Sequence, residues 1–126
     1  IVSETDDIKS ILENFESHHN QSFAVISPGD RKLVGMITLE HLKETLMIGE
    51  MAESLLAMDI MEAPKCTCRP DNLLPDVYKQ FSEHDTETMA IVDENSVACG
   101  VMEKYTADHY LHTRILELKS KLEKMG

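Results

Sequence analysis

The sequence predicts an α+β fold built from two similar halves that pack sheet to sheet about a pseudo-twofold axis, followed by a C-terminal helix. Three observations predict it: an amphipathic helix pattern that occurs twice, a pair of apolar strands that occurs twice at a matching spacing, and an apolar seam near the end of the chain. The 126 residues suffice for one compact domain with a shared core.

The repeated helix pattern is the strongest of these signals. Apolar residues over 8–15 are spaced i, i+3, i+4, i+7, and those over 74–81 repeat the spacing 66 residues later. Such spacing places the side chains on one face of a helix. The two sets are Ile8, Ile11, Leu12 and Phe15, and Leu74, Val77, Tyr78 and Phe81.

The strands repeat as well. Residues 23–27 match residues 89–93 at the same offset, and the triplet led by Gly35 matches the triplet led by Gly100 at an offset of 65. Short strands are expected at 1–2 and around 65–68, and Asp71 is a candidate N-cap of the second helix. One unit of about 55 residues cannot bury both faces of a three-stranded sheet, so two units are expected to share one core.

The chain therefore divides into four parts. Residues 1–46 form the first repeat, 47–63 an apolar linker expected to be helical and packed, 64–110 the second repeat and 111–126 a C-terminal helix. Apolar residues in this last part are spaced 4, 3, 4, 3, which is a heptad seam expected to pack on a partner chain. They are Leu111, Ile115, Leu118, Leu122 and Met125.

Composition excludes several classes of function. A net charge of −11 argues against a nucleic-acid surface and against docking on anionic lipid. No apolar run approaches the roughly 20 residues of a membrane span. We find no nucleophile–base pair and no Gly-rich phosphate loop, so we expect no enzyme activity. The first residue is Ile1, from which we expect a piece of a longer protein.

Histidines and cysteines are the candidate metal ligands. We interpret His18, His19 and His84 as polar helix ends, and the cysteines as structural thiols of a reducing cytosol, so no metal site is expected. Strand alternation would place Cys66 and Cys68 on one face and Thr67 on the other.

Two stretches resemble the CBS domain family. Residues 33–42, with Gly35-Met36-Ile37-Thr38 before a helix, look like the second half of a CBS domain. Met58-Asp59-Ile60-Met61, followed by Ala63-Pro64, resembles the Asp-h-Met signature that opens a CBS repeat (h, hydrophobic). The resemblance covers essentially the whole chain and implies a tandem CBS domain pair (Bateman module) with a regulatory role.

A narrower resemblance concerns the linker 55–61 and the stretch 100–104, which runs into Asp108-His109-Tyr110-Leu111. Both look like the cytosolic C-terminal CBS pair of the CLC chloride channel and transporter family. This implies a cytoplasmic domain attached to a membrane-embedded part, and a homodimer through the CBS faces and the C-terminal helix. The CBS pair of a magnesium or other ion transporter and a stand-alone cytosolic adenine-nucleotide sensor remain the alternatives.

The CBS resemblance also implies a ligand site for AMP, ADP or ATP. In the family a hydroxyl after the last strand meets phosphate, and an Asp three residues later binds the ribose. Thr38 takes the first position and His41 the second, with Cys66, Thr67 and Cys68 on the facing strand. His41 cannot accept from two vicinal hydroxyls as a carboxylate does.

The second repeat has lost this motif, because Glu103 and Thr106 stand at the two positions. We therefore expect at most a degenerate nucleotide site, and we favour a module that folds and dimerises without nucleotide.

Overall fold

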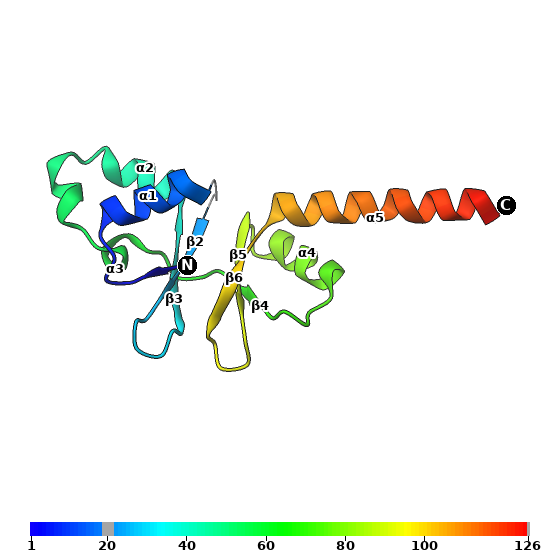
Figure 1. The fold of residues 1–126 in the computed structure, drawn as a ribbon, viewed down its shortest axis with the longest axis horizontal. Coiled ribbons are helices and arrows are strands. Elements are labelled where there is room, and N and C mark those ends of the chain that lie inside the picture. The colour runs from blue at the N-terminus through cyan, green and yellow to red at the C-terminus, as the bar shows by residue number, and fades with distance from the viewer. Residues whose placement is uncertain (19–21, 126) are drawn as a thin grey trace.

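The computed structural model describes residues 1–18 and 22–125 and contains two three-stranded sheets with helices on their outer sides (Figure 1). This confirms the predicted α+β class. The first repeat comprises β1 (Val2–Ser3), α1 (Ile8–His18), β2 (Ser22–Ile26), β3 (Leu33–Thr38) and α2 (Leu39–Leu46). The second comprises β4 (Thr67–Cys68), α4 (Leu74–Glu83), β5 (Thr88–Val92), β6 (Ala98–Glu103) and α5 (Lys104–Met125).

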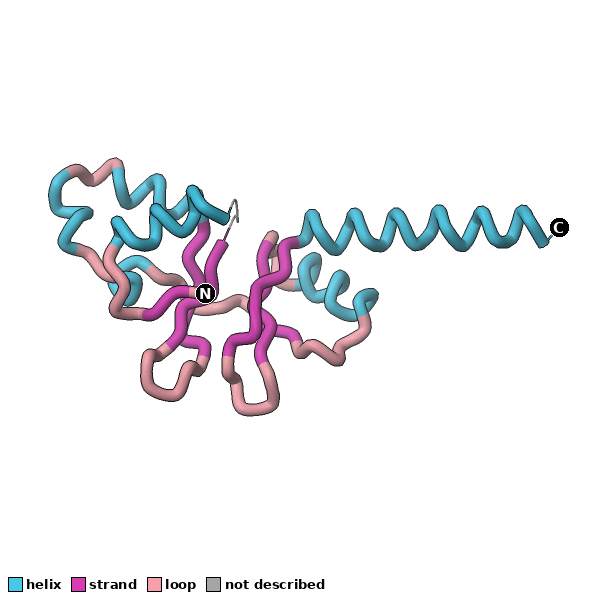
Figure 2. The backbone as a smooth tube through the Cα atoms, in the orientation of Figure 1, coloured by secondary structure: helices cyan, strands magenta, loops and turns pink. Residues whose placement is uncertain are grey.

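Both sheets have the same topology. The first strand pairs parallel with the second, which pairs antiparallel with the third, in the orders β1-β2-β3 and β4-β5-β6. The two hairpins lie next to each other (Figure 2). Their ends are joined by hydrogen bonds from the Leu33 amide to the Ser96 carbonyl (3.0 Å) and from the Ala98 amide to the Arg31 carbonyl (3.3 Å).

The sheets meet through an apolar layer that is rich in alanine. One buried cluster combines residues of β2, β3, β5 and β6, so both sheets contribute to the middle layer. Since each sheet buries its other face under helices, β2 is buried along its whole length. The middle layer contains Ala24, Ile26, Met36, Ala90 and Ala98.

The outer cores bury the predicted helix faces. Ile8, Ile11 and Phe15 of α1 pack with β2 and with Leu42 of α2, and Phe15 and Phe23 have ring centroids 4.5 Å apart. In the second repeat a smaller cluster lies under α4. It contains Cys68, Val77, Phe81, Met89 and Ala107.

The linker forms two short helical turns, the 3₁₀ helix η1 (Glu50–Ser54) and α3 (Ala57–Ile60). Hydrogen bonds tie it to the start of the chain, from the Ala57 amide to the Asp6 carbonyl (2.8 Å) and from the Met58 amide to the Glu4 carbonyl (2.9 Å). Ala57 and Ile60 are buried in the core of the first repeat.

The prediction that Asp71 caps the second helix is wrong. Helix α4 begins after Leu73, which has no side-chain cap, and Pro75 lies in the first turn, where its missing amide is harmless. The polar side chain before the helix serves the preceding turn instead, because Asn72 Oδ1 accepts from the Arg69 amide at 2.8 Å.

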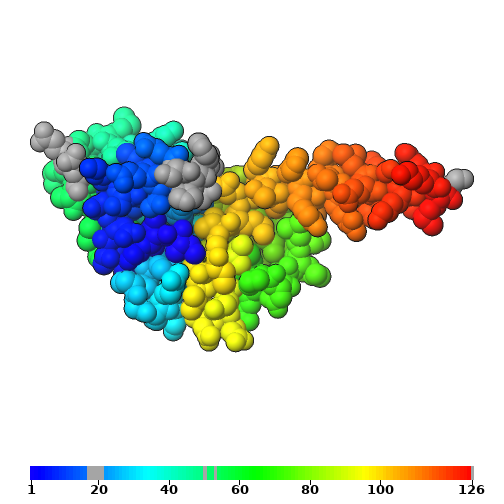
Figure 3. Space-filling model, viewed as in Figure 1, coloured from blue at the N-terminus to red at the C-terminus, as the bar shows by residue number. Residues whose placement is uncertain are grey.

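Helix α5 is continuous from Lys104 to Met125, so the structure has no break at the predicted boundary between 110 and 111. The segment lacks Gly and Pro, which explains why the helix runs on from the second repeat. Most of α5 projects away from the sheets (Figures 1 and 3), and Ala107 is its one buried residue. Among the described residues, none of the helices combines the length and apolarity needed to cross a membrane.

Candidate functional site

A cavity of about 500 Å³ lies between the two repeats and is lined by both of them. It is bounded by the end of β3, the linker after α3, the start of β5 and the β6–α5 junction. The lining residues are Met36, Thr38, Glu40, Glu62, Ala63, Lys65, Cys66, Asp85, Thr86, Glu87, Thr88, Glu103 and Tyr105. A volume of this size suits a small-molecule ligand.

Backbone and side-chain hydrogen bonds hold the walls of this cavity. Met36 and Glu62 exchange two amide-to-carbonyl hydrogen bonds of 2.9 Å, which fix the linker across β3. On the opposite wall, Lys65 Nζ donates to the Asp85 carbonyl at 3.2 Å and Thr86 Oγ1 donates to the Thr88 carbonyl at 2.9 Å. The linker is thereby fixed to the first repeat, and the opposite wall is held by hydrogen bonds within the second repeat.

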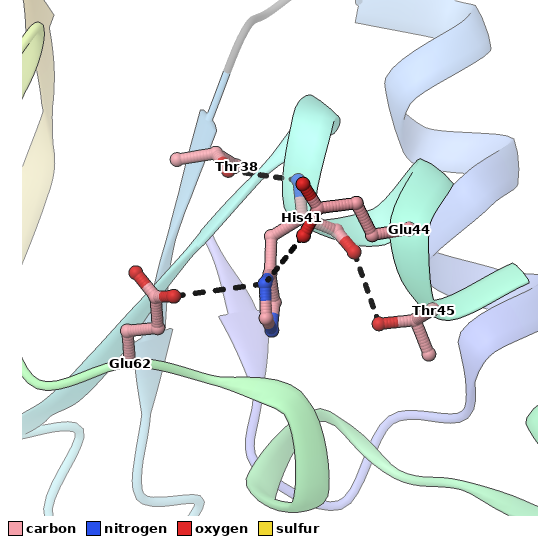
Figure 4. Close-up of polar contacts among 5 residues, drawn as sticks. All are labelled: Thr38, His41, Glu44, Thr45 and Glu62. Atoms are coloured by element: carbon pink, nitrogen blue, oxygen red, sulfur yellow. Dashed lines mark hydrogen bonds and ion pairs between the residues drawn. The ribbon is translucent and has the colours of Figure 1, made fainter.

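Thr38 lines the cavity at the junction between β3 and α2. Its Oγ1 accepts from the His41 amide at 3.1 Å and so caps α2 (Figure 4). The hydroxyl proton of Thr38 is not used in this bond and is available to a ligand. The N-terminus of α2 adds a partial positive charge beside it.

His41 does not line the cavity. Its Nδ1 lies 3.6 Å from Glu62 Oε1 and 3.8 Å from Glu44 Oε2, between two carboxylates (Figure 4). Its carbonyl accepts from Thr45 Oγ1 at 3.0 Å. The structure therefore gives His41 side-chain neighbours within its own repeat and linker rather than a place in the cavity wall.

The three residues predicted on the strand facing Thr38 have different surroundings in the structure. Cys66 lines the cavity, whereas Thr67 and Cys68 do not. Cys66 and Cys68 both contact the cluster under α4, which confirms that they share one face, and Thr67 is exposed. Burial raises the pKa of both thiols, and so favours their neutral form.

The sequence did not point to most of the cavity residues that the second repeat contributes. Lys65, Thr86, Thr88 and Tyr105 belong to no motif, and only the packing of the two repeats brings them to the cavity. The carboxylates that line the cavity also come from separate segments of the chain. Among the described residues, they are Glu40, Glu62, Asp85, Glu87 and Glu103, and the lining includes one lysine, Lys65. This lining disfavours a polyphosphate, because like charges repel strongly at a partly desolvated site.

A second cavity of about 490 Å³ lies at the other junction of the repeats. Glu103 and Thr106, the residues at the lost motif positions, both line it. Ser22 also lines it, and its Oγ is buried with no hydrogen-bond partner among the described residues. The other lining residues are Ile1, Phe23, Ile91, Cys99, Gly100, Val101 and Met102.

The candidate metal ligands are not gathered into a site in the part of the chain that the structure describes, where no group of three or more His, Cys, Asp or Glu is placed to hold a metal ion. His84 ends α4 as its C-cap, with its amide donating to the Gln80 carbonyl at 3.0 Å. The side chain of His18 and the whole of His19 lie outside the described residues.

Comparison with known proteins gives a family match over the first repeat. The CBS domain model matches residues 1–48, and no curated protein sequence matches the chain.

Solved structures match over most of the chain, with sequence identities of 18%, 14% and 16% for the three described below. The CBS domains of a transcriptional regulator from Streptococcus pneumoniae align with a TM-score of 0.74 over 86% of each chain. The acetoin utilization protein AcuB from Vibrio cholerae aligns with a TM-score of 0.78 over 95% of this chain and 87% of its own.

The third is the CBS domain pair of protein MJ0100 in complex with 5′-methylthioadenosine and S-adenosyl-L-methionine, with a TM-score of 0.76 over 90% of this chain and 89% of its own. The chain has the fold of a tandem CBS domain pair, and its first repeat matches the CBS domain family.

Proposed function

We propose that this chain is a regulatory CBS pair that binds an adenosine-type ligand of low negative charge between its repeats and acts by a change of conformation rather than by catalysis. The observation that carries the proposal is the cavity of about 500 Å³ whose walls come from both repeats and the linker. A ligand there contacts both halves at once, so it stabilises the arrangement of repeats that it binds best.

The charge of the cavity selects among adenosine compounds. Five carboxylates and one lysine line it, which favours a neutral or cationic ligand over AMP, ADP or ATP. Two threonine hydroxyls, those of Thr38 and Thr88, offer hydrogen bonds to a neutral polar group. The complex of MJ0100 with 5′-methylthioadenosine and S-adenosyl-L-methionine supports a ligand of this kind on the same fold.

Calorimetry and thermal shift test this proposal. We expect 5′-methylthioadenosine and S-adenosyl-L-methionine to bind more tightly than ATP. The variant A63W, which places an indole at an exposed position of the cavity wall, should abolish binding without loss of folding. Absence of heat and of any shift with all these compounds at millimolar concentration would overturn the proposal.

A charge variant tests the selectivity separately. Asp85→Asn with Glu87→Gln removes two carboxylates, and Asp85 has φ = +47°, a conformation that Asn also tolerates. This double variant should bind ATP more tightly than the wild type does. Glu94→Gln, in the exposed turn between β5 and β6, removes the same kind of charge away from the cavity and should leave ATP binding unchanged.

For the parent protein, we propose a cytosolic C-terminal CBS pair of a CLC chloride channel or transporter, associated as a homodimer. The resemblance of the segments 55–61 and 100–104 supports this, as does a match to the CBS domain of a membrane protein from Sphaerobacter thermophilus (17% identity, TM-score 0.73, 84% of this chain and 77% of that one).

The coding sequence upstream of Ile1 decides the parentage. Ten or more membrane-spanning helices of the CLC pattern are the expected result. A different transporter architecture, or a start codon a few residues upstream, would favour a magnesium transporter or a stand-alone sensor instead.

A further inference from the structure

Helix α5 presents an apolar seam that its own repeats leave uncovered. The side chains of the last two heptads are about half exposed or more: Ile115 51%, Leu118 46%, Leu122 68% and Met125 84%. Leu111, the first seam residue, is half-buried near the body. A 22-residue helix is about 33 Å long, and Figure 3 shows most of that length standing clear of the body.

The exposed area of the whole chain also calls for a partner. A compact monomer of 14.3 kDa has an accessible surface of about 6,800 Å², whereas this chain exposes 8387 Å². The excess of about 1,600 Å² is roughly twice the ~800 Å² that each partner contributes to a standard interface. The projecting helix thus offers enough surface for a stable association.

The charges beside the seam disfavour a coiled coil between two copies of α5. In the heptad frame, positions e and g hold His112, Arg114, Lys119 and Lys121, all of them basic. In a parallel pair Arg114 would face Lys119 of the second copy, and an antiparallel pair would also bring basic residues together. The seam therefore fits a surface that is apolar and acidic.

The body carries such a surface at the turn from α2 into η1. Met47, Ile48 and Met51 are 85%, 66% and 74% exposed there. In the sequence, the stretch 44–53 around these residues has three carboxylates and no basic residue (Glu44, Glu50 and Glu53), a net charge of −3, whereas 111–125 carries +2. We call Met47, Ile48 and Met51 the methionine patch.

The segment that leads from α2 into η1 and helix α5 lie at opposite ends of the long axis of the molecule (Figure 1). A two-fold axis perpendicular to that long axis brings each α5 beside the α2–η1 turn of the other copy, and the contact then closes as a dimer. We propose that α5 of one copy packs its seam on the methionine patch of a second copy, reciprocally. This contact is independent of the ligand proposed above.

Sedimentation of the full chain tests the contact. The wild type should be a dimer at about 100 μM, and Leu118→Glu with Leu122→Glu should weaken association at least a hundredfold. Ser120→Glu, on the opposite side of α5 from the seam, is the matched control and should leave it unchanged. A monomeric wild type, or a double variant that associates as the wild type does, would overturn the proposal.

A charge reversal distinguishes this contact from a coiled coil, because the two arrangements predict opposite changes in the strength of association. Lys119→Glu should weaken packing on the acidic turn about tenfold, because it replaces an attraction by a repulsion. In a coil of two α5 helices the same change would strengthen association, since the introduced carboxylate would then face Arg114 or His112 of the other copy. Stronger association of Lys119→Glu therefore contradicts the proposal.

Disulfide trapping identifies the surfaces that meet. Cys99 is exposed, so the background variant is Cys99→Ser. A mixture of chains bearing Met51→Cys and Leu122→Cys should give the mixed disulfide under mild oxidation. Disulfides between two Leu122→Cys chains with no mixed product would show that α5 pairs with itself. An absence of both products would refute any contact of the seam with a second copy.

Discussion

Gly35 lies in β3 where the linker crosses the sheet, and its substitution by alanine tests how tightly the two are packed. A methyl group on Gly35 would lie 2.7 Å from Sδ, 2.8 Å from Cγ and 2.9 Å from Cβ of Met61. The side chain of Met61 can turn away, but its Cβ moves only with the linker backbone. That backbone is held by the two hydrogen bonds between Met36 and Glu62.

Two opposing terms set the magnitude. Overpacking by one methyl group typically costs about 1–3 kcal/mol. Alanine gains about 0.4–1 kcal/mol over glycine through the unfolded state. The expected net loss for Gly35→Ala is therefore about 1–2 kcal/mol, or a fall in Tm of about 3–8 °C for a domain of this size.

Gly100 supplies the matched control. It is the counterpart of Gly35 in the second repeat, and among the described residues no atom beyond its two chain neighbours lies within 4 Å of the position that its Cβ would take. No linker residue crosses the sheet there, so Gly100→Ala should be neutral or should stabilise by about 0.4–1 kcal/mol. Urea unfolding followed by circular dichroism suits both variants, because the chain has no tryptophan.

A double variant locates the strain. Met61→Ala removes Cγ and Sδ but keeps Cβ, so Gly35→Ala with Met61→Ala should recover part of the loss, with a coupling energy of about 0.5 kcal/mol or more. Equal stability of Gly35→Ala and wild type, or an equal loss in Gly100→Ala, would refute the packing argument.

Three further predictions concern stability and thiol reactivity. Asp7→Ala should lower the Tm at pH 7, because Asp7 Oδ1 accepts from the Ser10 amide at 2.8 Å and caps α1. This hydrogen bond lowers the pKa of Asp7, so its contribution is present above the unfolded value of about 3.9 and is lost as the pH falls through the folded value. Melts near pH 2 should therefore no longer separate variant from wild type. Cys99 is exposed and should react with a disulfide reagent in the native protein, whereas Cys68, buried and with a raised pKa, should react only on unfolding; equal rates would contradict its burial. Leu42→Ala should cost about 2–5 kcal/mol in urea unfolding, since the side chain is fully buried, and a loss below about 1 kcal/mol would show that α2 is not anchored by it.

Local patterns explain why much of the fold follows from the sequence. The apolar spacing over 8–15 and 74–81 recurs as α1 and α4, and the offset repeat of strands recurs as two sheets of identical order. The start of α4 was predicted wrongly at Asp71, because a polar side chain before a helix can serve either the helix or the turn that precedes it.

The sequence by itself determined the two-fold repeat, the α+β class, the shared face of Cys66 and Cys68, and the seam on the last helix. These depend on periodicity along the chain, which sequence displays directly. Only the tertiary structure decided which residues line the cavity between the repeats, since Lys65, Thr86 and Thr88 reach it through contacts between segments far from Thr38. It also distinguished Gly35 from Gly100, which the repeat makes equivalent, because the linker crosses one sheet and not the other.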